Sequence, residues 1–452
     1  MRAFGYVFAA TLVARLGSLG TFLVTTRVLA MADMGELTVW HSVRGMLLVA
    51  LSIGLPDIIA RETAVRRDSG AFLSGARASF TLLAVAAVVL ELVLWLAPDW
   101  VALPHPRLLL VAAGVDLLPG LFMGSLAATG RIRAYALCIV VPALLASAGT
   151  VLLVLPPFSL GIGGALTAYI AASFVNVVLC LALLRPGVLP RGPRVDLRVL
   201  LRQSLPIFGA ALAGTFIVTI DRYSLRWLDG PTSVAAYAVV FQAAALLSFG
   251  GASVRTSLLS RLIAHIDQRT VISRYFDSYV ACGGMFAVFI AALAPEIIRL
   301  LAGVRYETQA PLAPVLCVAI LALELYSFGQ TLAVARQESH LAFRSILLAA
   351  GIAAVGVPLA CHLAAAFGVG LALMTAYGTS ALLILLPRAD GTLRSLGWLA
   401  AVALCACVLA VHYQWVDGFH SGPSMALRYS LAAVCAVLGA WHLKLLGRAP
   451  TA

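Results

Sequence analysis

Charged residues are scarce in this chain, and long stretches of it contain none. Asp, Glu, Lys and Arg make up 11% of the 452 residues, whereas 62% are hydrophobic and the mean hydropathy is +1.01. A soluble domain with a large core needs a more polar surface, so this composition excludes one. It predicts an all-α polytopic membrane protein whose apolar helices, of about 20 residues each, cross the bilayer.

Several patterns that point to particular chemistry are also missing. No loop contains a phosphate-binding P-loop, which argues against a primary ATP-driven pump. The eight cysteines lie in apolar segments without a CxxC pair, so neither a disulfide framework nor a metal site is indicated. The net charge of +12 is spread over short loops, which disfavours a nucleic-acid partner. We therefore expect no cofactor, no metal and no nucleic acid.

Apolar segments long enough to span a membrane recur along the chain, and we expect about 14 transmembrane helices. They predict an N-terminal lobe of six spans (1–184), a cytoplasmic inter-lobe loop (185–204), a second lobe of six spans (205–390), and two extra C-terminal helices with a cytoplasmic tail (391–452). The expected spans are 4–29, 37–59, 78–97, 108–129, 134–155, 162–184, 205–228, 234–260, 275–294, 312–335, 345–366, 368–386, 396–413 and 424–446.

The basic residues predict the orientation of these spans. Of the 31 Lys and Arg residues, 21 fall in the terminal segments and the loops on one side of the predicted bundle, and three fall on the opposite side. Cytoplasmic loops carry the excess of Lys and Arg. We therefore expect a multi-pass protein of the cytoplasmic (inner) membrane, with both termini and the central loop in the cytoplasm.

A weak internal repeat supports two related lobes. A shift of 195 residues places Thr26 and Arg27 over Asp221 and Arg222, and Gly35 over Gly230. Internal duplication is a common plan of secondary transporters, in which the substrate site lies between the repeats.

Basic residues inside the expected spans are the first candidates for substrate binding, because an arginine within the bilayer usually faces a partner or a watery cavity. Arg15 lies near the middle of its span, too deep to reach the headgroups easily. Arg27, Arg222 and Arg255 lie closer to span ends, where snorkelling is the alternative. Arg44 lies in the second span. A cationic cavity formed by these residues favours an anionic cargo.

Acidic residues inside the spans are candidates for ion coupling. Asp116 and Glu324 lie near the middle of their spans, at nearly equivalent places in the two halves. A buried carboxyl group can exchange protons as access alternates, and a structural ion pair or hydrogen bond is the alternative. Asp221 cannot simply pair with its neighbour Arg222, because adjacent residues point in different directions on a helix. His41, one turn before Arg44, either joins a polar cluster or is hydrogen-bonded filler.

Several short segments resemble one family of membrane proteins. YVFAATLVARLG at residues 6–17, TRVL at 26–29 and MGEL at 34–37 are similar to the start of polysaccharide transporters. In the second half, SLP at 204–206, DRY at 221–223, Gly230 and AY at 236–237 continue the likeness. Together they resemble the oligosaccharide (O-antigen type) flippases of the multidrug/oligosaccharidyl-lipid/polysaccharide exporter superfamily.

This resemblance implies two pseudo-symmetric six-helix lobes around a central cavity, alternating access, and a polyprenyl-pyrophosphate-linked oligosaccharide as cargo. O-antigen and exopolysaccharide units are both compatible head groups, and a polysaccharide polymerase is a further candidate partner besides membrane lipids. A pyrophosphate offers acceptor oxygens that arginine engages with paired donors. In this interpretation Arg15, Arg27, Arg44, Asp221, Arg222 and Arg255 bind cargo, and Asp116 and Glu324 couple transport to an ion.

Two other functions remain open at this stage. A cation-coupled drug or metabolite exporter of the same superfamily looks to a carboxylate in the first lobe, but the first span here offers Arg15 and Arg27 and no acid. A membrane polysaccharide polymerase or glycosyltransferase usually presents its chemistry on large outer loops. The longest outer loops expected here have about ten residues each and form no catalytic constellation; they are Pro98–Pro106, Arg299–Ala310 and Gln414–Pro423.

Overall fold

The computed structural model of the protein describes residues 2–56, 58–59, 70–96, 105–128, 131–183, 197–248, 269–336, 338–385, 393–415 and 422–447. These residues are helical almost throughout, as expected where the bilayer offers no water to backbone N–H and C=O groups. They form two compact units, Met1–Thr219 (unit 1) and Ile220–Ala452 (unit 2). Residues 184–196 lie outside the described ranges, so the expected lobe boundaries at 184 and 205 stay a prediction.

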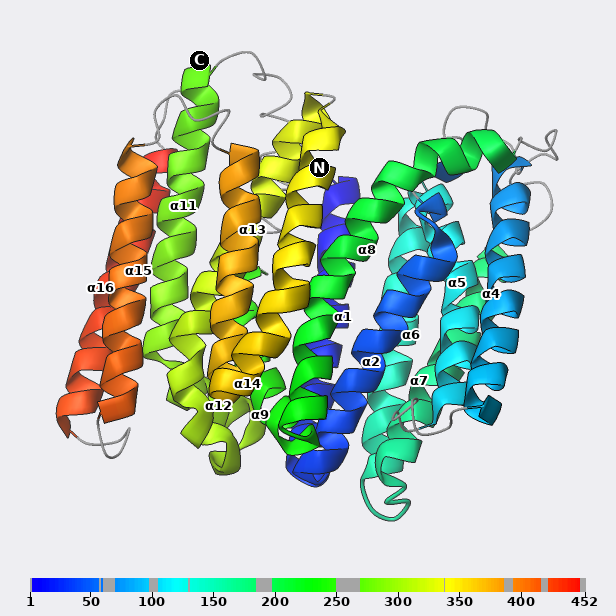
Figure 1. Ribbon diagram of the computed structural model, residues 1–452, viewed down its shortest axis with the longest axis horizontal. Coiled ribbons are helices and arrows are strands. Elements are labelled where there is room, and N and C mark those ends of the chain that lie inside the picture. Colours follow the sequence, from blue (N-terminus) through cyan, green and yellow to red (C-terminus); the bar gives the residue numbers. More distant parts are fainter. Residues whose placement is uncertain are drawn as a thin grey trace. The chain divides into compact units, whose positions relative to one another are not determined.

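Unit 1 is a helical bundle in which α6 contacts both α1 and α7, while α5 contacts α2, α4 and α7 (Figure 1). Its apolar core includes Leu117 and Leu121 of α5, which pack with Leu51 and Leu55. The helices of this unit are α1 (Arg2–Val28), α2 (Met31–Ser52), α4 (Gly70–Leu96), α5 (Pro106–Ala128), α6 (Ile132–Val154), α7 (Gly161–Leu183) and the first part of α8 (Leu197–Leu228).

The second expected span, 37–59, is shifted in the structure because α2 begins earlier and ends at Ser52. Ile53 and Gly54 have positive φ angles of 49° and 66°, which stop the helix. A side chain at Gly54 would lie 2.9 Å from the backbone nitrogen of Phe208 and 3.0 Å from the carbonyl oxygen of Ser204. Glycine therefore allows both the left-handed turn and the close approach of α8.

Unit 2 continues with α8 and is built around α11, α13 and α14. The C-terminal helices α15 and α16 both pack on α11 (Figure 1). Its other elements are α9 (Pro231–Ala244), α11 (Arg269–Ala292), α12 (Ala294–Ala302), the 3-10 helix η2 (Val304–Leu312), α13 (Ala313–Ala335), α14 (Ser339–Leu385), α15 (Leu393–Trp415) and α16 (Gly422–Gly447).

The eleventh and twelfth expected spans both fall in α14, which folds back on itself. Ala364 and Ala365 have non-helical backbone angles. The ideal Cβ position of Gly356 lies 3.9 Å from the Cβ of Ala372, although these residues would be about 24 Å apart along a straight helix. The two halves of α14 are therefore separate helices joined at this break, near the position where the sequence separates the two spans.

The segment between the ninth and tenth expected spans differs from the loop predicted over Arg299–Ala310. It forms α12 and η2, which are separated by Gly303 with a φ angle of 89°. Pro295 starts α12, and the apolar residues Ile298 and Leu301 are buried. The loop prediction failed because a nine-residue helix is too short to be recognised as a span.

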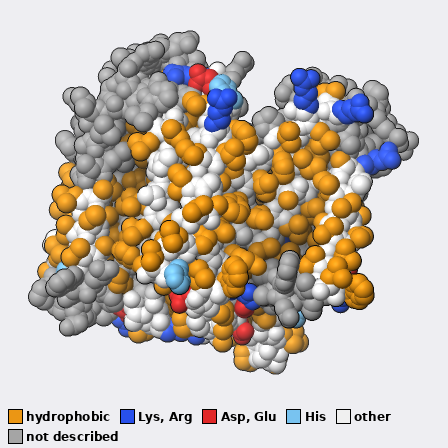
Figure 2. All heavy atoms as spheres, viewed as in Figure 1, with side chains coloured by type: hydrophobic (Ala, Val, Ile, Leu, Met, Phe, Trp, Pro, Cys, Tyr) orange, Lys and Arg blue, Asp and Glu red, His pale blue; other side chains and the backbone are white. Residues whose placement is uncertain are grey.

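Nine helices among the described residues are long and apolar enough to cross a membrane. On the face shown in Figure 2, hydrophobic side chains cover the middle, and charged side chains lie near the top and the bottom of the view. The protein is therefore a helical polytopic membrane protein, as the composition predicts, and the number of 14 spans stays a prediction.

Candidate functional site

Three helices of unit 1 bring a polar cluster together inside the apolar bundle. Arg44 on α2 donates from Nη1 to Oδ2 of Asp116 on α5 at 2.7 Å. The hydroxyl of Tyr169 on α7 donates to the same oxygen at 2.6 Å. The guanidinium carbon of Arg44 also lies 4.2 Å from the centre of the Tyr169 ring. The ring therefore supports the cation while its hydroxyl holds the anion.

Aromatic residues line the rest of this cluster. Trp40 is fully buried and meets the Tyr169 ring edge-on, with ring centres 6.3 Å apart. His41 lies 5.5 Å from the same ring and 5.3 Å from Trp40. Trp40 belongs to an apolar core that includes Leu109 of α5 and Leu166 of α7. This packing fixes the three helices around the ion pair.

The exposure of the pair differs from that of a closed structural contact. The side chain of Arg44 is 18% accessible and that of Asp116 is 14% accessible. The cluster thus contains a cation that still reaches an accessible surface and an anion that is held from two helices.

The structure places Arg15 and Arg27 on α1, where both side chains are exposed and both take part in polar or electrostatic contacts. Their 12-residue separation corresponds to about 18 Å along the helix and a rotation of about 120° around it. A single diphosphate cannot bind to both of them at once. The arginines that the sequence groups as cargo-binding residues therefore have different surroundings. Arg44 pairs with Asp116, whereas Arg15 and Arg27 lie far from each other on α1.

In unit 2, Asp221 on α8 is fully buried and accepts a hydrogen bond from the Tyr237 hydroxyl of α9 at 2.7 Å. The backbone N–H of Arg222 donates to the other carboxylate oxygen at 2.6 Å. The guanidinium carbon of Arg222 lies 4.9 Å from the ring centre of Phe241. The adjacent side chains thus make different contacts, as expected for neighbours on a helix, and Asp221 ties α8 to α9.

The remaining predicted residues are Glu324 and Arg255. Glu324 on α13 is buried and accepts a hydrogen bond from the Tyr279 hydroxyl of α11 at 2.8 Å. Each unit thus holds a carboxylate of the proposed coupling pair against a tyrosine hydroxyl of another helix. Arg255 lies outside the described residues.

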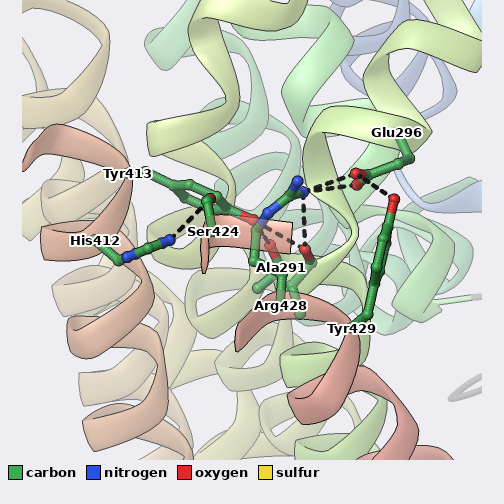
Figure 3. Close-up of polar contacts among 8 residues, drawn as sticks. Ala291, Glu296, His412, Tyr413, Ser424, Arg428 and Tyr429 are labelled. Atoms are coloured by element: carbon green, nitrogen blue, oxygen red, sulfur yellow. Dashed lines mark hydrogen bonds and ion pairs between the residues drawn. The ribbon is translucent and has the colours of Figure 1, made fainter. Parts of the chain in front are cut away.

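A second arginine cluster joins the C-terminal helices to the rest of unit 2 (Figure 3). Arg428 on α16 is fully buried, and its Nη1 donates to both carboxylate oxygens of Glu296 on α12 at 2.9 and 2.8 Å. Tyr429 donates to Glu296 at 3.1 Å, and Tyr413 of α15 donates to the carbonyl oxygen of Ala291 at 2.7 Å. These contacts fasten α15 and α16 to the ends of α11 and α12.

Sequence reasoning missed the tyrosine partners of the buried carboxylates and the partner of Arg428. A tyrosine in an apolar span signals a hydroxyl that needs an acceptor, but the spacing along one helix does not show which other helix supplies it. Among the described residues, no group of three or more His, Cys, Asp and Glu side chains could hold a metal ion.

The fold is that of transporters of the MOP superfamily. Lipid II flippase MurJ in an inward closed conformation matches with a TM-score of 0.70 and 15% identity, over 97% of this chain and 99% of MurJ. An inward-facing multidrug resistance MATE family transporter of the MOP superfamily matches with a TM-score of 0.64 and 15% identity, over 90% of this chain and 96% of the transporter. The Vibrio cholerae MATE transporter VcmN in its bent form gives a TM-score of 0.59 and 17% identity, over 89% and 97% of the two chains.

The chain belongs to the polysaccharide biosynthesis protein family, whose model matches residues 1–259. A comparison with curated protein sequences finds no match. The family match confirms the resemblance drawn from the sequence, and the fold is one that solved membrane transporters and a lipid flippase share.

Proposed function

We propose that the protein is a flippase that moves a polyprenyl-pyrophosphate-linked oligosaccharide from the inner to the outer leaflet of the cytoplasmic membrane by alternating access. The observation that carries this proposal is an accessible arginine, Arg44, inside a helical bundle of a polysaccharide biosynthesis protein. A diphosphate is the charged group of such a cargo, and arginine binds phosphate oxygens with a planar fork of donors.

The other arginines have separate roles in this proposal. Arg15 lies about midway along α1 and receives the diphosphate at a different depth from Arg27, because about 18 Å of helix separates them. Arg222 contributes a cation from α8, supported by the ring of Phe241. Arg255 is proposed as a further contact. Asp221 acts by holding α8 against Tyr237 and not by touching the anionic cargo.

Asp116 and Glu324 are proposed as the coupling residues. Each carboxylate accepts a tyrosine hydroxyl from a neighbouring helix, so a change in its charge alters a contact between two helices. A proton-coupled cycle would use that change to favour one of the alternating conformations.

Transport in reconstituted vesicles tests the proposed function. Purified protein in liposomes should move a fluorescent polyprenyl-diphosphate disaccharide across the bilayer, as measured by the fraction of label that a membrane-impermeant quencher reaches. Arg15→Ala should insert normally and lose transport, because it removes a cationic side chain from the middle of α1. A wild-type protein that moves no polyprenyl-linked sugar, either in liposomes or as precursor accumulation after depletion in cells, would contradict the proposal.

The second candidate is a cation-coupled drug or metabolite exporter, because the fold is shared with a multidrug resistance MATE family transporter. The paired state of Asp116 with Arg44 favours the flippase, since a carboxylate already neutralised by arginine is a poor site for a cationic drug. Export of a cationic dye from energised vesicles, with no movement of the sugar-lipid, would favour the exporter.

The orientation and partner predictions belong to the same proposal. With the arginine-rich loops inside, both termini face the cytoplasm and the flipped sugar unit is delivered to polymerase machinery on the outer face. Reporter domains that are active only in the cytoplasm should give signal when fused to either end of the chain. A signal from one end alone would contradict this topology.

A further inference from the structure

The ion pair of unit 1 joins two residues that the sequence assigns to different tasks, Arg44 to cargo binding and Asp116 to coupling. We infer that Asp116 and a diphosphate anion compete for the Arg44 guanidinium, so that Asp116 is an internal counter-anion which the cargo displaces. This inference deepens the proposed function and rests on it for the identity of the cargo.

The contact between Arg44 and Asp116 has one-point geometry. Arg44 reaches the Asp116 carboxylate through Nη1 and Oδ2 alone. In the same unit, Arg107 binds Glu91 with two parallel bonds, from Nε at 2.8 Å and from Nη2 at 3.0 Å. Two-point pairs of this kind are the stronger and more specific arrangement. The Arg44 pair is therefore the less completely formed of the two, although it is the more buried.

Arg44 keeps a donor that the pair does not use. Its Nε is buried and has no hydrogen-bond partner among the described residues. A buried donor without an acceptor costs free energy that a rearranged contact would recover. A diphosphate presents several oxygens and can occupy the fork of donors that Asp116 occupies at one point. Exchange of the carboxylate for the diphosphate thus increases the number of charge-assisted hydrogen bonds to Arg44.

The displaced carboxylate keeps a partner. The Tyr169 hydroxyl of α7 hydrogen-bonds Asp116 independently of Arg44. The Tyr169 ring supports the guanidinium without a hydrogen bond to it. The cation can therefore turn towards an incoming anion while α7 retains the carboxylate. In the absence of cargo, re-formation of the pair avoids an unpaired arginine in the bilayer.

Binding of inorganic pyrophosphate to the purified full-length protein in detergent, measured by calorimetry, tests this competition. Asp116→Asn removes the competing charge and should lower the Kd for pyrophosphate by about tenfold, equivalent to about 1.4 kcal/mol. Arg44→Ala should abolish the gain, so that the double variant binds no more tightly than Arg44→Ala alone. Asp116→Ser, which is also neutral and keeps a polar hydroxyl at this position, is the second variant if Asp116→Asn does not fold.

Glu91→Gln is the matched control because it also releases an arginine, Arg107, within unit 1. Its Kd should stay at the wild-type value, since the exposed Arg107 lacks the enclosed surroundings of Arg44. A gain in Glu91→Gln equal to that of Asp116→Asn, an unchanged or raised Kd in Asp116→Asn, or a gain that persists without Arg44 would each overturn the inference.

The flipping assay separates this inference from the proposed function. A wild-type protein that moves no sugar-lipid but shows the expected pyrophosphate affinities would contradict the proposed cargo alone. A protein that moves the sugar-lipid and shows no gain in Asp116→Asn would contradict the competition alone.

Discussion

Two arginine–carboxylate pairs, one in each unit, show how the same two chemical groups can serve a site or a structure. Arg428 has no accessible surface and contacts both oxygens of Glu296, with two tyrosine rings nearby. Arg44 is 18% accessible and contacts one oxygen of Asp116, above one tyrosine ring. Full burial of Arg428 makes the first pair a fixed joint even though Glu296 is 29% accessible, whereas the partial exposure of Arg44 leaves the second pair open to exchange.

The largest effect is expected from removing the buried arginine, Arg428. Arg428→Ala leaves a cavity and takes away the cationic partner of Glu296, which keeps only the hydrogen bond from Tyr429, and should destabilise the protein by about 3 kcal/mol. Denaturant unfolding of the purified protein measures this loss. Arg428→Lys is the control and should be intermediate, because an ammonium group lacks the guanidinium's spread of donors. An Arg428→Ala variant as stable as the wild type would show that the joint is not needed.

The second prediction concerns the pair of Arg44 and Asp116. Arg44→Ala should reduce sugar-lipid transport by at least about tenfold, because the protein loses a charge-assisted contact with the diphosphate of the cargo. Its loss of stability should be smaller than that of Arg428→Ala, because Arg44 is 18% accessible whereas Arg428 is fully buried. Transport initial rates and unfolding midpoints measured on the same samples test the comparison. A greater loss of stability in Arg44→Ala would reverse it.

A milder change in the cluster around Arg428 is Tyr413→Phe. The hydroxyl of Tyr413 donates to the carbonyl oxygens of Ala291 and Ala292 at 2.7 and 3.0 Å. Its removal should cost about 1 kcal/mol of stability without affecting transport. The unfolding midpoint and the transport rate together check this expectation, and a loss of transport at unchanged stability would disagree with it.

The corresponding change in the cluster around Arg44 is Tyr169→Phe. The ring over Arg44 remains, while the hydrogen bond to Asp116 is lost, so transport should change less than in Tyr169→Leu, which removes both contacts. The transport rates of the two variants show directly which change has the larger effect. Equal rates in both would mean that the ring makes no contribution.

The smallest effect is expected at the exposed pair of Glu91 and Arg107. Their side chains are 53% and 73% accessible, and exposed ion pairs contribute little even with two-point geometry. Glu91→Gln should leave the unfolding midpoint unchanged within experimental error. A clear decrease would indicate that the environment of this pair is less aqueous than its exposure suggests.

Much of the fold follows from the sequence because a membrane helix is specified by a run of apolar residues. The ends of α6 at Ile132 and Val154 lie within two residues of the expected span, since polar or proline residues flank the run on both sides. The early end of α2 could not be predicted as well. The apolar run continues through Ile53, and only the positive φ angles of Ile53 and Gly54 stop the helix.

The candidate site was only partly predictable. Arg44 and Asp116 stand out as charged residues in apolar segments, but the sequence does not show that 72 positions of separation bring them to 2.7 Å. Tyr169 carries no charge and looks like any other aromatic residue of a membrane helix. Its role depends on two contacts from different helices, and such contacts are determined by the packing of α2, α5 and α7.

The hydroxyl of Tyr169 also provides an optical readout of the site. A phenol that donates to a carboxylate absorbs at a different wavelength in the near ultraviolet from one with a weaker acceptor, and its ring vibrations shift as well. If an incoming diphosphate draws Arg44 away from Asp116, the bond from Tyr169 to the carboxylate strengthens. An isotope-labelled tyrosine at this position would therefore report loading of the carrier without any attached dye.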